Sequence, residues 1–211
     1  MLNNVNLWEG KMKIYVVRHG QTDYNVQGLF QGRKDIPLNS IGLKQAEETA
    51  KKFQDIPVDV ILVSPLIRAR ETAKYVANVT GVKPIIEQDL VERSFGDMEG
   101  KPNSEDCNIK MLLDYGKNYN ICNVEPIQSL FKRVSNCLDK IIYRYMGKNI
   151  VLVTHGGVAQ AIDCYFNGFP KNNDLQSIAL KNCEIREYTP SEKLMDIIKD
   201  EKIKEKYHVE L

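Results

Sequence analysis

Residues 13–20 read Lys-Ile-Tyr-Val-Val-Arg-His-Gly, a short apolar run that ends directly in a basic tripeptide. Its length and β-branched content predict a buried strand. Residues 150–157 read Ile-Val-Leu-Val-Thr-His-Gly-Gly and repeat this arrangement. Each histidine therefore follows a predicted strand at its carboxyl end, where open α/β sheets bind their ligands.

Strands and helices alternate along the rest of the chain. The pattern predicts further strands over residues 58–63, 84–87, 178–180 and 184–188, and helices over residues 40–54, 64–79, 126–146 and 157–166, with others near 108–115 and from 191 onward. Ser40 is the predicted N-cap of its helix, Pro65 falls in a first helical turn, and Gly81 ends that helix. The predicted fold is a three-layer α/β/α sandwich with a mainly parallel central sheet.

Length and composition are those of an ordinary globular protein. The chain has 211 residues, of which 43% are hydrophobic and 27% charged, and this excludes collagen-like, disordered and disulfide-scaffold classes. We expect residues 1–12 to be an N-terminal extension and residues 13–211 to form a single domain. The formal net charge is +1 with no basic stripe, so neither nucleic acid nor a membrane surface is an expected partner.

The five cysteines are widely spaced and include no Cys-x-x-Cys pair. This pattern favours a reducing cytoplasm over a disulfide framework. No long apolar stretch or export signal is visible. The oligomeric state is not decided by the sequence, which leaves a homodimer open.

Two arginines accompany the two histidines. Arg18 precedes His19, and Arg68 lies in the first turn of the helix that follows the strand over 58–63. Guanidinium groups bind planar anions in a bidentate manner, so the set suits a phosphoryl group, and a carboxylate would fit too. A neutral imidazole in such a cradle favours phosphoryl transfer, because histidine can attack phosphorus. Zinc is a weaker interpretation, since a third ligand is missing and the arginine charges oppose a cation.

The ordered motifs resemble the histidine phosphatase superfamily, also called phosphoglycerate-mutase-like. The matching blocks are Arg18-His19-Gly20-Gln21-Thr22 with Asn25, Gln31-Gly32, Asp35-Ile36-Pro37-Leu38, Gly42, Gln45-Ala46, Ser64-Pro65-Leu66-Ile67-Arg68-Ala69, Thr72-Ala73, Glu92-Arg93, Phe95-Gly96, Glu99-Gly100 and Thr154-His155-Gly156-Gly157. An Arg-His-Gly tripeptide alone is weak, whereas ordered blocks with compatible spacing are specific.

The resemblance implies a role for each matching residue. His19 would be the nucleophile that becomes phosphohistidine, Glu92 would protonate the leaving oxygen, and no metal or cofactor would be needed. Arg18, Arg68 and His155 would bind the phosphoryl oxygens. Substrate contacts would come from Asn25, Gln31 and Gly156. We expect Arg70 and Arg93 to lie on a solvated face.

The resemblance also favours the phosphatase branch. A short segment separates Gly100 from His155, with a cover expected at about 101–125, whereas the glycolytic mutases carry a longer cover there. Gly157 stands where those mutases typically have asparagine. The expected activity is hydrolysis of a small phosphorylated metabolite through phosphohistidine. A cofactor-dependent phosphoglycerate mutase is the alternative, and a non-catalytic module that binds a phosphorylated ligand is a further one.

The sequence departs from the common family pattern at several positions. Glu71 stands where glutamine is frequent, and Met98 stands where tryptophan often precedes Glu-Gly. Residues 123–126, Asn-Val-Glu-Pro, replace a Gly-Gly-Glu-Ser type stretch. We therefore expect an altered rim of the pocket, and the identity of the substrate does not follow from the resemblance.

Overall fold

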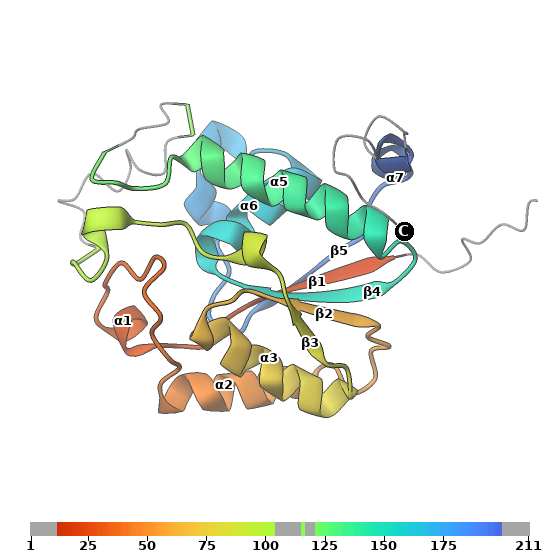
Figure 1. The fold of residues 1–211 in the computed structure, drawn as a ribbon, viewed down its shortest axis with the longest axis horizontal. Coiled ribbons are helices and arrows are strands. Elements are labelled where there is room, and N and C mark those ends of the chain that lie inside the picture. The colour runs from red at the N-terminus through yellow and green to blue at the C-terminus, as the bar shows by residue number, and fades with distance from the viewer. Residues whose placement is uncertain (1–11, 104–114, 117–120, 200–211) are drawn as a thin grey trace, which may run out of the picture.

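A five-stranded sheet lies between two layers of helices (Figure 1). The computed structural model describes residues 12–103, 115–116 and 121–199. The strands are β1 (Lys13–Arg18), β2 (Val60–Val63), β3 (Pro84–Ile86), β4 (Asn149–Thr154) and β5 (Ile185–Tyr188), in the order β3-β2-β4-β1-β5. The neighbouring strands β3, β2, β4 and β1 pair in parallel, and β5 runs antiparallel to β1 at the edge. The predicted mainly parallel sheet is confirmed.

Alternate side chains of the strands enter two separate cores, because successive residues of a strand point to opposite faces. Ile14 and Val16 of β1 pack with α5 (Ile127–Arg144) and α6 (Gly156–Asn167). Tyr15 and Val17 pack in the core of α2 (Ser40–Lys51) and α3 (Ile67–Thr80). Figure 1 shows these two helix pairs on opposite sides of the sheet, which confirms the three-layer prediction.

The remaining helices in the described part of the chain are short. They are α1 (Asp23–Val26), α7 (Glu192–Lys199) and the 3₁₀ turns η1 (Gln88–Leu90), η2 (Gly96–Met98), η4 (Lys171–Asn173) and η5 (Leu175–Ile178). The strand predicted over residues 178–180 was wrong. Ile178 ends η5, and the carbonyl of Leu180 accepts a hydrogen bond from Arg18 Nη1 instead of joining a ladder.

Two helix starts differ from the prediction. The N-cap of α2 is Asn39, whose Oδ1 accepts a hydrogen bond from the Gly42 N–H at 2.8 Å, so Ser40 is the first helical residue instead of the cap. Helix α3 begins at Ile67, and Pro65 lies ahead of its first turn. Gly81 ends α3 with φ at 73°, as predicted, because glycine adopts this left-handed conformation without steric cost.

Several predictions fall outside the described residues. These are the extension over residues 1–12 apart from Met12, the helix near 108–115 apart from Tyr115, and most of the cover at 101–125. Across residues 12–103, 115–116 and 121–199, no helix combines the length and the apolar character that crossing a membrane requires.

Candidate active site

The two strand-end histidines lie side by side. β1 and β4 are neighbours, with Arg18 paired to Thr154, so His19 and His155 leave the sheet at the same level. The N–H of His19 donates to the Thr154 carbonyl at 2.9 Å, and the two imidazole rings have centroids 5.1 Å apart. Both side chains are buried. The register of the parallel pair thus brings together residues that are far apart in the sequence.

The surroundings of His19 leave one ring nitrogen available as a nucleophile. Nδ1 lies 2.7 Å from the carbonyl oxygen of Gly20, which can only accept, so Nδ1 carries the hydrogen and Nε2 keeps its lone pair. Burial holds the pKa of His19 well below its usual value, and the charges of Arg68 and Arg18 lower it further. The ring is therefore neutral near neutral pH.

His155 is fixed by a serine from the neighbouring strand end. Its Nε2 lies 2.6 Å from Oγ of Ser64, the residue that follows β2. Burial lowers the pKa of His155 well below its usual value, with further lowering by Arg68 and His19. Ser64 Oγ also accepts the Leu66 N–H, so its own hydrogen is free to point to Nε2. In that arrangement Nδ1 of His155 carries a hydrogen and can donate it.

Two arginines face the histidines: Arg68 is buried and Arg18 is half-buried. Arg68 donates from its terminal nitrogens to the carbonyls of Lys34 and Gly32, at 2.7 and 2.8 Å, and Arg18 donates to Leu180 at 2.6 Å. Burial lowers the pKa of Arg68 to about 10, which leaves it charged at neutral pH. The loop carbonyls therefore orient both guanidinium groups before any ligand is present.

Three buried polar atoms of this cluster have no partner among the described residues: Nε of Arg18, Nε of Arg68 and Nδ1 of His155. A buried polar group without a hydrogen bond costs about 1–3 kcal/mol, so native proteins rarely leave three together. All three can act as donors and two belong to cations. Their arrangement therefore suits an anion with several acceptor oxygens.

Glu92 belongs to the same cluster. Its Oε1 accepts the N–H of Arg93 at 2.9 Å, and its Oε2 accepts the N–H of Gly157, in the first turn of α6, at 3.2 Å. The carboxylate raises the pKa of both Arg18 and Arg68, against the larger effect of burial, which places its charge near both guanidinium groups. Two backbone donors therefore hold the buried Glu92 carboxylate in this cluster.

The remaining predicted contacts line one cavity of about 210 Å³ together with Arg18, His19, Arg68 and Glu92. Asn25 Oδ1 accepts the Thr22 N–H at 3.0 Å, and Gln31 Oε1 accepts the Thr22 hydroxyl at 3.0 Å. Both amide oxygens thus face the protein, and each NH₂ remains as a donor for a ligand. Gly156 begins α6 at the cavity wall, where an added Cβ would lie 3.6 Å from Arg18.

All eight predicted site residues come together. Seven of them line the cavity, and His155 lies beside His19. The expectation for Arg93 was wrong, because its side chain is 2% exposed and lines the same cavity. Its Nε donates to the Glu125 carbonyl at 2.8 Å, and burial lowers its pKa to about 10. Arg70 is exposed, as expected.

Sequence reasoning missed much of the outer wall. This wall includes Leu29, Phe30, Phe95, Asn103, Ile127, Leu130, Phe131, Gln160, Leu175, Gln176 and Ala179. Several of these residues sit in irregular segments, where no periodic pattern marks a direction. The adjacency of Arg93 to Glu92 was the one signal that could have identified it.

The described residues offer a poor setting for a metal ion. Glu92 is the one carboxylate among the described residues that line the cavity, and three arginines line it too. Elsewhere in the described chain, Glu87, Asp89 and Cys137 bring three donor atoms close together. Burial raises the pKa of the Cys137 thiol far above its usual value, so a metal ion bound there would have to displace its proton.

Comparison with known proteins gives the family. The model of the histidine phosphatase superfamily (branch 1) matches residues 14–199. The chain belongs to this superfamily. Among its superfamily relatives is the "Uncharacterized phosphatase PhoE" of Bacillus subtilis, 37% identical over 173 residues, which cover 80% of this chain and 83% of the relative. "Phosphoglycerate mutase-like protein 4" of Arabidopsis thaliana is 33% identical over 158 residues, covering 71% and 69%.

A solved structure shows the same fold. A phosphoserine phosphatase from Entamoeba histolytica, determined in complex with 3-phosphoglyceric acid, aligns with a TM-score of 0.72 and 27% identity. The alignment covers 85% of this chain and 91% of that one. Membership of the histidine phosphatase superfamily and the phosphoglycerate-mutase-like fold are thus both confirmed.

Proposed function

We propose that the protein is a phosphomonoesterase that hydrolyses a small phosphorylated metabolite through a phosphohistidine at His19. The observation that carries the proposal is the position of a neutral imidazole among the unpartnered donors of Arg18, Arg68 and His155. A phosphoryl group offers three oxygens to such donors, and its phosphorus is open to in-line attack.

In the first step, Nε2 of His19 attacks phosphorus and the bond from phosphorus to the ester oxygen breaks. Glu92 gives its proton to that oxygen, and the alcohol leaves. Arg18, Arg68 and Nδ1–H of His155 stabilise the charge on the phosphoryl oxygens throughout.

In the second step, water attacks the phosphohistidine and the P–N bond breaks. Glu92, now a carboxylate, takes a proton from the water, so inorganic phosphate leaves and the enzyme returns to its starting state. A mutase would instead return the phosphoryl group to the bound organic molecule. The phosphatase name of the 37% identical relative supports hydrolysis, and the mutase-like relative keeps the alternative in view.

Trapping the intermediate tests this proposal. Rapid quenching with a ³²P-labelled substrate should give acid-labile, alkali-stable label on the peptide that contains His19, and His19→Ala should show neither label nor turnover. The panel should include phosphoserine, 3-phosphoglycerate, sugar phosphates and p-nitrophenyl phosphate. Label found only on serine or a carboxylate would refute the assignment of the nucleophile, and phosphoryl return without phosphate release would indicate a mutase.

We also propose that hydrolysis requires no divalent metal, because Arg18 and Arg68 already supply fixed positive charge at the phosphoryl site. Dialysis against EDTA should leave kcat/KM unchanged. A loss of activity that added Mg²⁺ or Zn²⁺ restores would contradict this.

Four described cysteines, at 122, 137, 164 and 183, are free thiols, which supports a cytoplasmic location for the enzyme.

A further inference from the structure

The segment that carries Glu92 is held by side chains instead of by secondary structure. After η1 ends at Leu90, residues 91–95 form neither helix nor strand. Four consecutive carbonyls nevertheless have donors. Arg133 Nη1 donates to Asp89 at 2.6 Å and to Val91 at 2.9 Å, Thr154 Oγ1 donates to Leu90 at 2.9 Å, and Arg33 Nε donates to Glu92 at 3.2 Å.

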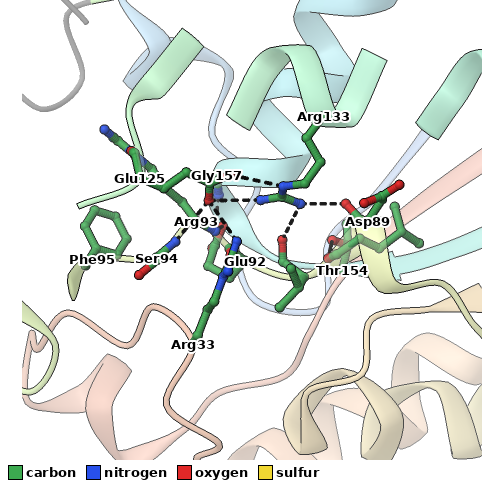
Figure 2. A network of polar contacts seen from close by, with 12 residues as sticks. Arg33, Asp89, Glu92, Arg93, Ser94, Phe95, Glu125, Arg133, Thr154 and Gly157 are labelled. Carbon is green, nitrogen blue, oxygen red and sulfur yellow. Dashed lines mark hydrogen bonds and ion pairs between the residues drawn. The ribbon is translucent and has the colours of Figure 1, made fainter. Parts of the chain in front are cut away.

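Arg133 is the central member of this set (Figure 2). It projects from α5, and its Nε and Nη2 donate to the two oxygens of Glu125, each at 3.1 Å. The planar guanidinium thus forms a fork with one carboxylate while its remaining nitrogen reaches the carbonyls of Asp89 and Val91. A bidentate pair of this kind has one orientation, so it transfers the rigidity of α5 to the irregular segment.

Glu125 holds the other side of Glu92. Its Oε2 accepts the Ser94 N–H at 3.2 Å, and its backbone N–H donates to the Ser94 carbonyl at 2.9 Å. Its carbonyl accepts Nε of Arg93 at 2.8 Å. Figure 2 shows these contacts converging on Glu125 from Arg33, Ser94 and Arg133. Glu92 therefore lies between two anchored points of the backbone.

We propose that Arg133 and Glu125 are positioning residues: they fix the position of the Glu92 carboxyl group so that it can reach the leaving oxygen of the substrate. Neither lines the cavity, so each acts through Glu92 and not on the substrate. The inference rests on the proposed role of Glu92 as the acid. A displacement of a catalytic group by about 1 Å can cost on the order of a hundredfold in rate.

A comparison of two leaving groups tests this. In a single-turnover burst, Arg133→Gln should slow an alkyl phosphate, such as phosphoserine, by about tenfold to a hundredfold. It should slow p-nitrophenyl phosphate by less than about threefold, because p-nitrophenolate leaves with little protonation. Arg144→Gln, at an exposed position near the end of the same helix, should change neither rate. Equal losses of Arg133→Gln on both substrates would refute the positioning role.

Two further variants separate geometry from charge and from folding. Arg133→Lys keeps a positive charge near His155 but cannot form the fork, so it should show the same bias toward p-nitrophenyl phosphate. Full recovery in Arg133→Lys would refute the proposal in favour of a purely electrostatic effect. Glu125→Gln keeps the shape of the acceptor and weakens the fork, so it should show a smaller bias of the same kind even where Arg133→Gln folds poorly.

A double-mutant cycle connects the effect to Glu92. Because Arg133 is proposed to act through Glu92, the variant Glu92→Gln/Arg133→Gln should be no slower on the alkyl phosphate than Glu92→Gln, within about twofold. Multiplied losses would refute the positioning role. If Glu92→Gln itself shows no leaving-group bias, the assignment of the acid fails. If Glu92→Gln shows the bias and Arg133→Gln does not, the positioning role alone fails.

Discussion

At position 157, the absence of a side chain on glycine lets α6 approach Glu92 closely. A Cβ built on Gly157 would lie 2.8 Å from Oε1 of Glu92, which is closer than real Cβ contacts come. The same atom on Gly156 would meet Arg18 at an ordinary 3.6 Å. The observed position of Glu92 therefore requires glycine at the second of these two adjacent positions.

This contrast gives a matched pair of variants. Gly157→Ala should displace the Glu92 carboxylate and lose its hydrogen bond to the residue 157 N–H, so turnover of an alkyl phosphate should fall by about tenfold or more. Gly156→Ala should lose less than about threefold, since its methyl group makes only ordinary contacts. Steady-state kcat/KM for both variants measures the difference, and a larger loss in Gly156→Ala would contradict the geometry.

The common location of the candidate site residues could be predicted, whereas the side-chain environment of Arg93 could not. His19, His155 and Arg68 each follow an apolar strand, so their shared edge is implied by a parallel sheet. Arg93 lies in an irregular segment, and its burial depends on Glu125, which is 32 residues away along the chain. No local pattern reports such a contact, and an arginine with no periodic context is by default assigned to the surface.

At the scale of elements, α2 packs directly against the backbone that follows His19. A Cβ on Gly42 would lie 2.1 Å from the carbonyl oxygen of Gln21, and a Cβ on Gly20 would lie 2.5 Å from the carbonyl oxygen of Gly42. Two glycines thus allow the first turn of α2 to contact the chain just after His19. This contact supports the loop on which the imidazole depends.

Gly42→Ala should therefore have the opposite effect to an ordinary glycine-to-alanine change in a helix, which adds up to about 1 kcal/mol of stability. Here the added methyl group meets backbone that cannot move freely, so unfolding should become easier by about 1–3 kcal/mol, and kcat/KM should fall. Ile41→Ala, at an exposed position in the same turn, should stay within about 0.5 kcal/mol. Urea unfolding of both variants provides the measurement.

Most of the strands and longer helices were predicted with their order and type, and the errors lie at their ends and in the strand predicted over residues 178–180. Ser40 and Asn39 are both good caps, and only the hydrogen bond from Gly42 shows which one serves. The run over residues 178–180 has apolar residues but no neighbouring strand to pair with, because β5 already occupies the edge beside β1. Pairing partners are a tertiary property, so a run of three residues cannot reveal them.

At the scale of the whole molecule, the buried histidines couple stability to pH. The pKa values of His19 and His155 both lie well below the ordinary 6.5 in the folded protein, chiefly because of burial. The unfolded chain therefore binds protons that the folded chain does not. This contribution to stability is present above pH 6.5 and is lost as the pH falls below it.

The free enzyme should thus unfold more easily at about pH 5.5 than at about pH 7.5, with a slope of up to about 1.4 kcal/mol per pH unit for each ring. Urea titrations across this interval measure the slope. His19→Gln should reduce this slope by the contribution of one imidazole ring, because glutamine does not titrate. An unchanged slope in that variant would show that other groups take up the protons.

The division of the cavity between sheet and loops has a consequence for how such enzymes diversify. The groups that we propose bind the phosphoryl oxygens lie at strand ends and on the first turns of α3 and α6, whereas Phe30, Phe95 and Asn103 of the outer wall come from connecting segments. Loops tolerate substitution and insertion far better than a buried sheet does. Substitutions and insertions in those segments, by evolution or by design, can therefore change the metabolite that is bound while the reaction stays the same.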